Sequence, residues 1–191
     1  MASLNPFALI PETWRSGVFL VCLMLMIVAG RGVQWANRKM RSAARAGEKT
    51  TVKRPAELTS ASDGRDVRTK LDALGEDGRK WFRWSLTIDF VLLTCIAGSV
   101  GLAGLWASAQ LPSSPWLREL GTVMSWTVCF AALADVGENS TLLWIERAKS
   151  GDPVVDALLV VGAFCTKAKM LTAVPAAYAL GGAVAYLWRR C

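Results

Sequence analysis

The hydrophobic positions of this chain fall into four long runs, separated by polar or turn-forming segments. A helix needs about 20 mostly apolar residues to cross the hydrocarbon core of a bilayer, and each run is long enough. The expected spans cover residues 14–35, 84–106, 120–145 and 154–188, approximately. The pattern therefore predicts an all-α integral membrane protein, a four-helix bundle in a single membrane domain of residues 1–191.

Tryptophan is concentrated at the ends of these runs. Indole side chains prefer the boundary between water and hydrocarbon, so this placement supports the proposed spans over a soluble bundle of unusually apolar helices. Trp126 is the exception, because it lies well inside the third run. The tryptophans at or near run ends are Trp14, Trp35, Trp81, Trp84, Trp106, Trp116, Trp144 and Trp188.

The connections between the runs differ in length. The second and third spans are joined near residues 111–115, and the third and fourth by residues 147–153, which contain Gly and Pro. Short connections make neighbouring helices antiparallel. We therefore expect spans two, three and four to run up, down and up.

The connection between spans one and two, residues 36–83, is long and basic. From Arg31 to Arg83 the chain has fourteen Lys or Arg and seven Asp or Glu. Lys and Arg near span ends favour the cytoplasmic side, so this connection is predicted to be cytoplasmic and both termini to lie on the opposite side. Its first part, as far as Arg54, is expected to be irregular or a surface helix, and it also suits contact with anionic lipid head groups.

A short amphipathic helix is predicted within this connection. Val67, Leu71 and Leu74 recur at helical spacing, and Gly75 is a suitable stop. We expect this helix to lie on the membrane surface or to cap the bundle. A further helix begins near Gly78 and continues into span two.

Composition excludes several kinds of chemistry. Hydrophobic residues make up 53% of the chain and charged residues 19%, and there is no histidine. Catalytic triads, metal sites and haem sites that depend on His are therefore excluded. The cysteines form no C-x-x-C pair and there is no Gly-rich phosphate loop, so we expect no metal and no cofactor. The basic segment has no interleaved aromatic residues, which argues against a nucleic-acid partner.

Ionisable residues within the spans are the main functional signal. Such residues are costly in a bilayer and usually face the interior of the bundle. The ionisable or amide residues within the spans are Asp89, Asp135, Glu138, Asn139, Lys167 and Lys169. Counting residues from the connecting turns, at 1.5 Å of rise each, places Asp89, Asp135, Glu138 and Lys167 near one level, slightly cytoplasmic of the bilayer centre.

Asp135, Glu138 and Asn139 are spaced i, i+3, i+4 and share one face of span three. Lys167 and Lys169 point in different directions, so only one is expected to reach the carboxylates, and depth favours Lys167. The cluster then has more acids than bases. At least one carboxyl group is expected to hold its proton near neutral pH, because desolvation and like-charge repulsion disfavour a second anion.

Two sequence motifs carry a resemblance. Ser85-Leu86-Thr87-Ile88-Asp89-Phe90 and Asp135-Val136-Gly137-Glu138-Asn139 resemble the S-L-x-x-D-F entry to span two and the D-x-x-E-N motif in span three of an uncharacterised, mostly bacterial family of four-span membrane proteins. The likeness covers residues 59–169, approximately. It implies that Asp89, Asp135, Glu138, Asn139 and Lys167 form a shared polar centre, and it implies a bacterial inner membrane location.

The sequence leaves several functions open. The first is binding of a lipid-like small molecule, with or without acid/base chemistry, in which Glu138 or Asp135 is the acid or base and Asp89, Asn139 and Lys167 bind the substrate. The second is an accessory or structural subunit of a larger membrane complex, in which the polar residues only fix helix packing. A proton- or ion-coupled carrier ranks last. The expected partners are membrane lipids, and either partner membrane subunits or further copies of this chain.

Overall fold

The computed structural model describes residues 5–43, 55–60, 64–110, 115–148 and 152–170. Within these ranges the chain forms helices joined by turns, and no strand. The elements in chain order are η1 (Pro6–Leu9), α1 (Glu12–Ala43), η2 (Pro55–Ser60), α2 (Gly64–Ala73), α3 (Gly75–Gln110), α4 (Pro115–Arg147) and α5 (Val154–Met170).

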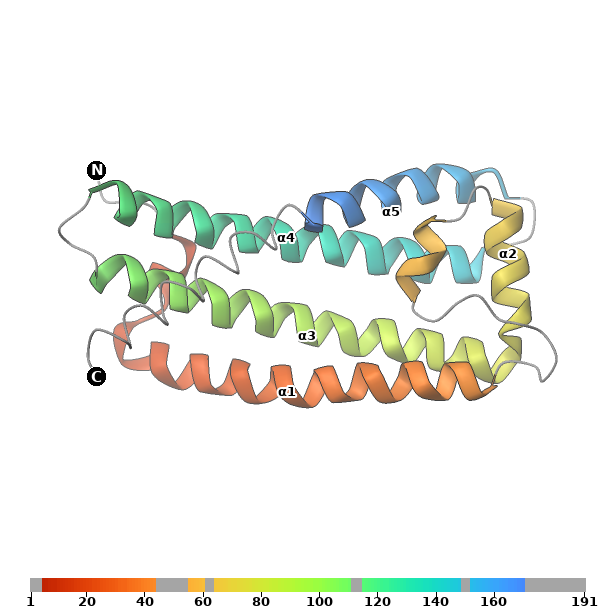
Figure 1. Cartoon of the computed structure of the whole chain (residues 1–191), viewed down its shortest axis with the longest axis horizontal. Helices are drawn as coiled ribbons and strands as arrows, with labels where there is room; N and C mark the ends of the chain where they lie inside the picture. Colours follow the sequence, from red (N-terminus) through yellow and green to blue (C-terminus); the bar gives the residue numbers. More distant parts are fainter. Residues whose placement is uncertain (1–4, 44–54, 61–63, 111–114, 149–151, 171–191) are drawn as a thin grey trace.

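The long helices lie in a row (Figure 1). Helix α1 packs against α3, α3 packs against α4, and α5 lies along one half of α4, while α2 crosses one end of the row. Helices α3, α4 and α5 run in alternating directions, as their short connections require. The described residues thus form a row of helices, and the expected four-helix bundle stays a prediction. The second half of the expected fourth span, 171–188, lies outside the described residues.

Three helical segments are long and apolar enough to cross a membrane: Glu12–Ala43, Gly75–Trp106 and Gly121–Arg147. Their outer faces carry large apolar side chains that no described residue covers, such as Met24 on α1 and Phe130 and Leu133 on α4. A soluble protein rarely exposes apolar surface of this extent. These properties are consistent with an integral membrane protein.

Helix α1 continues beyond the expected end of the first span at Trp35 and ends only at Ala43. The segment that follows Trp35 contains no Gly or Pro and several strong helix formers. Ala36 and Met40 are fully buried, and Asn37 accepts a hydrogen bond from Ser85 of α3 (2.9 Å). The first part of the basic connection is therefore an extension of α1, stabilised by packing against α3.

A compact apolar core forms at this end of the molecule, which we call the basic end. Gly75 has a positive φ of 66°, which lets the chain turn sharply from α2 into α3 at little steric cost. The turn folds the apolar face of α2 onto the ends of the long helices. The core consists of Met40, Leu58, Val67, Leu71, Leu74, Phe82, Leu86, Leu142, Ile145, Val155 and Leu159.

The opposite end of the row is closed by η1. The Asn5 side chain accepts a hydrogen bond from the Phe7 backbone N–H (3.0 Å) and donates one to Ser125 Oγ of α4 (3.0 Å). The Phe7 ring lies so close to Gly101 of α3 that a Cβ there would be 2.0 Å from a ring carbon. Glycine at position 101 therefore permits η1 to pack against α3 and α4.

Candidate functional site

Three polar side chains on α4 are buried in the middle of the molecule. Asp135, Glu138 and Asn139 have exposed fractions of 6%, 1% and 4%. Their i, i+3, i+4 spacing places them on one side of the helix, and that side is covered by α3 and α5. The neighbouring Val136 and Ser140 are exposed on the other side of α4. The burial of the three residues thus follows from the helical period.

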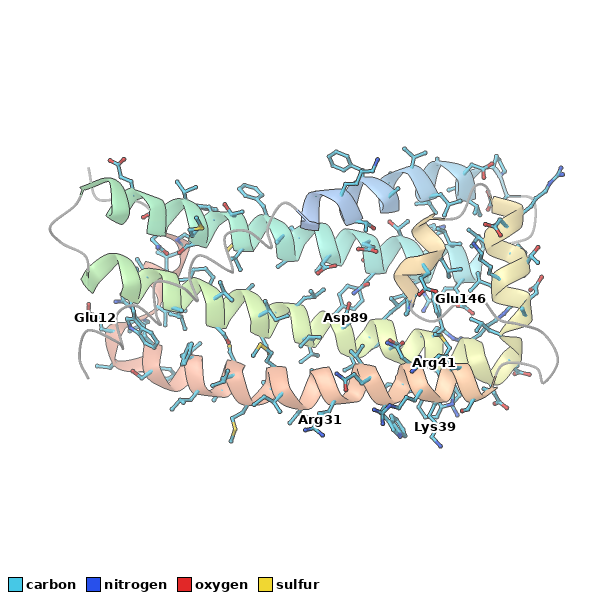
Figure 2. The ribbon with its side chains drawn as sticks, viewed as in Figure 1. Glu12, Arg31, Lys39, Arg41, Asp89 and Glu146 are labelled. Atoms are coloured by element: carbon cyan, nitrogen blue, oxygen red, sulfur yellow. The ribbon has the colours of Figure 1, made fainter. Side chains whose placement is uncertain are left out.

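Asp89 of α3 joins this group. Asn139 Nδ2 donates a hydrogen bond to Asp89 Oδ2 over 2.9 Å, and Figure 2 shows Asp89 between α3 and α4, in the central part of the row. The bond links positions 50 residues apart in the chain. The structure therefore brings together Asp89 and Asn139, two of the polar residues that the sequence analysis singled out within the spans.

Helix α5 approaches the group through Cys165. A Cβ at Gly137 of α4 would be 3.1 Å from Cys165 Sγ, so the absence of a side chain at Gly137 lets α5 pack closely. The Cys165 thiol also interacts electrostatically with both Asp135 and Glu138. The carboxyl groups thus lie at the junction of α3, α4 and α5, and we call Asp89, Asp135, Glu138 and Asn139 the carboxylate cluster.

Lys167 does not reach the carboxylate cluster. Its side chain is exposed on α5, and no ion pair joins it to a carboxylate of the described residues. The physical reason is helical geometry, because two residues correspond to about 200° of rotation, and Cys165 already faces α4. The sequence analysis favoured Lys167 because of its expected depth in the membrane. Depth does not indicate which face of the helix carries a residue. The side chain of Lys169 lies outside the described residues.

A second buried carboxylate was missed by the sequence analysis. Glu146 near the end of α4 is 8% exposed, and its Oε1 lies 3.8 Å from Nε of Arg83 on α3. Its other oxygen, Oε2, is buried and forms no hydrogen bond with any described residue. Glu146 follows Asn139 by seven residues, so it lies on the same stripe of α4. This spacing from Asn139 is the sequence signal that could have revealed it.

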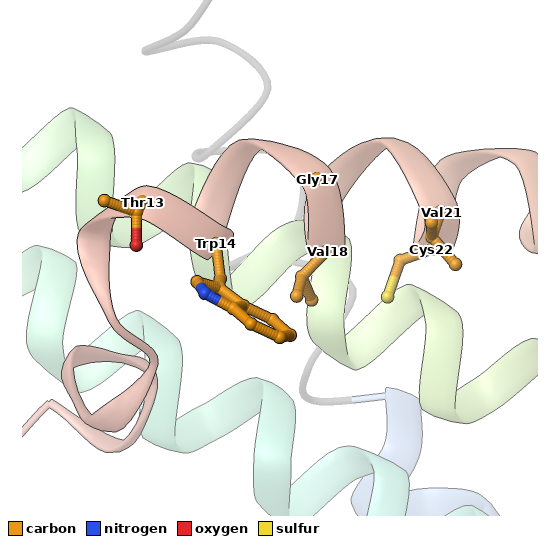
Figure 3. A pocket seen from close by; sticks show the side chains of 6 residues that line it. All are labelled: Thr13, Trp14, Gly17, Val18, Val21 and Cys22. Atoms are coloured by element: carbon orange, nitrogen blue, oxygen red, sulfur yellow. The ribbon is translucent and has the colours of Figure 1, made fainter.

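An apolar hollow of about 480 Å³ lies away from the cluster, beside the first turns of α1 (Figure 3). Of its lining side chains only Thr13 and Trp14 carry an O–H or N–H group, whereas orienting a bound molecule generally needs several polar groups. The hollow is lined by Thr13, Trp14, Gly17, Val18, Val21 and Cys22.

The carboxylate cluster has the groups for proton exchange and hydrogen bonding. A carboxyl group accepts hydrogen bonds through its oxygens and, when protonated, also donates one. The Asn139 amide is engaged with Asp89, which fixes its orientation. The described residues include no group of three or more His, Cys, Asp or Glu side chains arranged to hold a metal ion.

Comparison of the chain with protein-family models, with curated proteins and with solved structures finds no match.

Proposed function

We propose that this chain is a small polytopic membrane protein whose carboxylate cluster binds a lipid-like small molecule and exchanges a proton with it. The observation that carries the proposal is the near-complete burial of Asp135 and Glu138 between helices whose outer faces are apolar. Ionisable groups in such surroundings are expensive, and they are mostly found where a site needs them. Helix packing alone requires fewer polar groups, since interhelical hydrogen bonds in membranes contribute only about 1 kcal/mol.

The proposed roles follow from burial and hydrogen bonding. Glu138 is the most buried carboxyl group of the cluster, and we assign it the proton exchange, with Asp135 as its partner. Asn139 and Asp89, held together by their hydrogen bond, orient a polar head or double bond of the bound molecule. Isomerisation of a lipid suits this set of groups, because it needs a proton delivered at one carbon and removed at another.

Glu138→Gln tests the proposal without removing the hydrogen-bonding shape of the side chain. Protein purified in mild detergent is incubated in D₂O, and the retained lipids are extracted and measured by mass spectrometry. The wild-type protein should retain a defined species that acquires deuterium, and Glu138→Gln should lower the deuterium incorporation at least about a hundredfold. Retention without incorporation indicates a binding protein, and absence of a retained species contradicts the proposal.

Glu146→Gln is the matched control. It makes the same substitution at another buried carboxyl group of α4, about two turns away and beside Arg83. The Glu146→Gln variant should retain the same lipid species as the wild type, with the same deuterium incorporation. Equal losses in the two variants would mean that any buried carboxyl group of α4 matters only for packing, and would contradict a site at Glu138.

The membrane arrangement is a part of the same proposal. We place the basic end in the cytoplasm and both termini on the opposite side of a bacterial inner membrane, with a fourth span over residues 154–188. The exposed basic residues at the end of α1 and Arg147 at the end of α4 support this orientation. The bacterial location depends on the resemblance of the two motifs to the four-span family, which stays a prediction.

An accessory subunit of a larger membrane complex is the second candidate, and one observation favours it. Trp126 and Phe130 are both exposed on α4, with ring centroids 6.2 Å apart. Trp126 lies inside the span rather than at its end, where indole is usually found. An exposed aromatic pair at that depth suits contact with a helix of another protein. Under this alternative, Trp126→Ala releases a co-purifying partner and Glu138→Gln does not.

A further inference from the structure

One face of α1 changes its character sharply along its length. Its first part is apolar and exposed, with Leu20, Met24, Ile27 and Val28 pointing away from α3. On the same third of the helix circumference, the next positions are Arg31, Trp35, Arg38 and Lys39, which are also exposed. Figure 2 shows Arg31 and Lys39 on the side of α1 that faces away from α3. We call Arg31, Trp35, Arg38 and Lys39 together the Arg31 face.

The position of this change matches the dimensions of a bilayer. Trp14 and Trp35 are exposed at the two ends of the apolar stretch, and 21 residues of helix separate them by about 32 Å. The hydrocarbon core of a bilayer is about 30 Å thick. Trp35 therefore marks the level of the head groups, and Arg31, one turn inside it, is placed to extend its guanidinium outward to the same level.

The charged residues of α1 at this level are all basic. Helix α1 has no acidic residue after Glu12, and no ion pair with a described residue involves Arg31, Arg38 or Lys39. Helix α2 and the start of α3, at the same end of the molecule, differ because their basic residues are accompanied by acids. Asp66 pairs with Lys70, and Asp72 pairs with Arg68 and Arg79.

We propose that the Arg31 face binds the head groups of anionic phospholipids. Guanidinium groups form paired hydrogen bonds with phosphate oxygens, Trp35 occupies the interfacial layer, and the adjoining apolar stretch lies along the acyl chains. That stretch makes a phospholipid, rather than a free phosphate, the occupant. The inference depends on the proposed membrane location but not on the carboxylate cluster.

Spin-labelled lipids test this inference in the reconstituted full chain. The protein is placed in phosphatidylcholine bilayers containing a trace of spin-labelled phosphatidylglycerol or spin-labelled phosphatidylcholine. Electron paramagnetic resonance then gives the fraction of each lipid immobilised by the protein. Wild type should prefer phosphatidylglycerol, and R31Q/R38Q should lower this preference at least about threefold, because each basic residue near the surface attracts anionic lipid appreciably.

R65Q/R147Q is the matched control, since it also removes two exposed positive charges from the basic end, but from α2 and α4. It should keep the preference of the wild type. An equal decrease in both variants, or no preference in the wild type, overturns the Arg31 face as a binding surface. If R31Q/R38Q does not reconstitute, R38Q alone is measured, with the same direction expected and about half the effect on a logarithmic scale.

The outcome also separates this inference from the proposed function. A protein that does not enter bilayers at all contradicts the membrane location, and with it both proposals. A protein that enters bilayers and immobilises both lipids equally contradicts only the Arg31 face. Loss of deuterium exchange in Glu138→Gln with an intact lipid preference leaves both proposals standing.

Discussion

The two halves of the α3–α4 interface are built on different principles. In the half near η1 the helices approach through small residues: a Cβ at Gly104 would be 3.6 Å from the Gly121 carbonyl oxygen and 3.3 Å from Ser125 Oγ. Ser125 Oγ accepts a hydrogen bond from Asn5 and lies 3.0 Å from the Gly121 carbonyl oxygen of its own helix and 3.4 Å from the Gly101 carbonyl oxygen of α3. This half resembles the small-residue contacts on which membrane helices rely for association.

The other half contains the carboxylate cluster and the Arg83–Glu146 pair. It buries ionisable groups where apolar or small residues would pack at lower cost. The comparison teaches that α3 and α4 can associate closely without carboxyl groups. Under the proposed function the acidic half serves binding or chemistry rather than stability, so substitutions in the two halves should differ in their effects.

The largest loss of thermal stability is expected for Gly104→Leu in the small-residue half. The side chain would push against Ser125 and the backbone of α4, and overpacking of this kind costs up to about 3 kcal/mol. Thermal unfolding in detergent, followed by circular dichroism, should show a strongly lowered midpoint. Gly17→Leu is the control, because no atom lies within 4 Å of its expected Cβ. Equal midpoints for the two variants would show that α3 and α4 do not meet at Gly104.

Ser125→Ala should have an intermediate effect. It removes the hydroxyl that binds the buried Asn5 amide, and an unsatisfied buried polar group costs about 1–3 kcal/mol. The same unfolding measurement applies, together with protease sensitivity of the N-terminal segment, which should increase as η1 detaches. Ser140→Ala, at an exposed position of the same helix, should change neither. An undisturbed N-terminal segment in Ser125→Ala would argue against the contact.

The smallest effect on stability is expected in the acidic half. Asn139→Ala removes the hydrogen bond to Asp89, and double-mutant cycles of such bonds in membranes average about 0.6 kcal/mol. A cycle with Asp89→Ala should give a coupling energy of this order, while under the proposed function either variant should impair lipid retention. A coupling energy of several kcal/mol, with lipid retention unchanged, would instead make this half the structural one.

Much of the fold could be anticipated from periodicity and turn chemistry. Helix α2 occupies the stretch where Val67, Leu71 and Leu74 predict an amphipathic helix, and the transition to α3 occurs at Gly75. Pro115 begins α4 and Asp152 caps the start of α5 through its hydrogen bond to the Val154 backbone N–H (3.0 Å). These features are local, so the sequence contains the information that specifies them.

The candidate site could be anticipated only in part. The spacing of Asp135, Glu138 and Asn139 was enough to place them on one buried face, whereas the hydrogen bond between Asn139 and Asp89 is known only from the structure. The sequence could not show that Lys167 points away from the carboxylates, because the rotation of α5 about its own axis depends on where Cys165 meets Gly137. Glu146 was overlooked because its burial depends on the fold of α3 and the core at the basic end.

The sequence by itself determined the helices, the apolar stretches long enough for a membrane, and the presence of acids among them. These depend on length, period and residue type along a continuous segment. Only the tertiary structure decided that the helices form a row, that α1 extends to Ala43, that η1 closes one end, and that Lys167 faces outward. The reason is that the rotation and partner of each helix are set by contacts between residues far apart in the chain, such as Asp89 with Asn139 and Asn5 with Ser125.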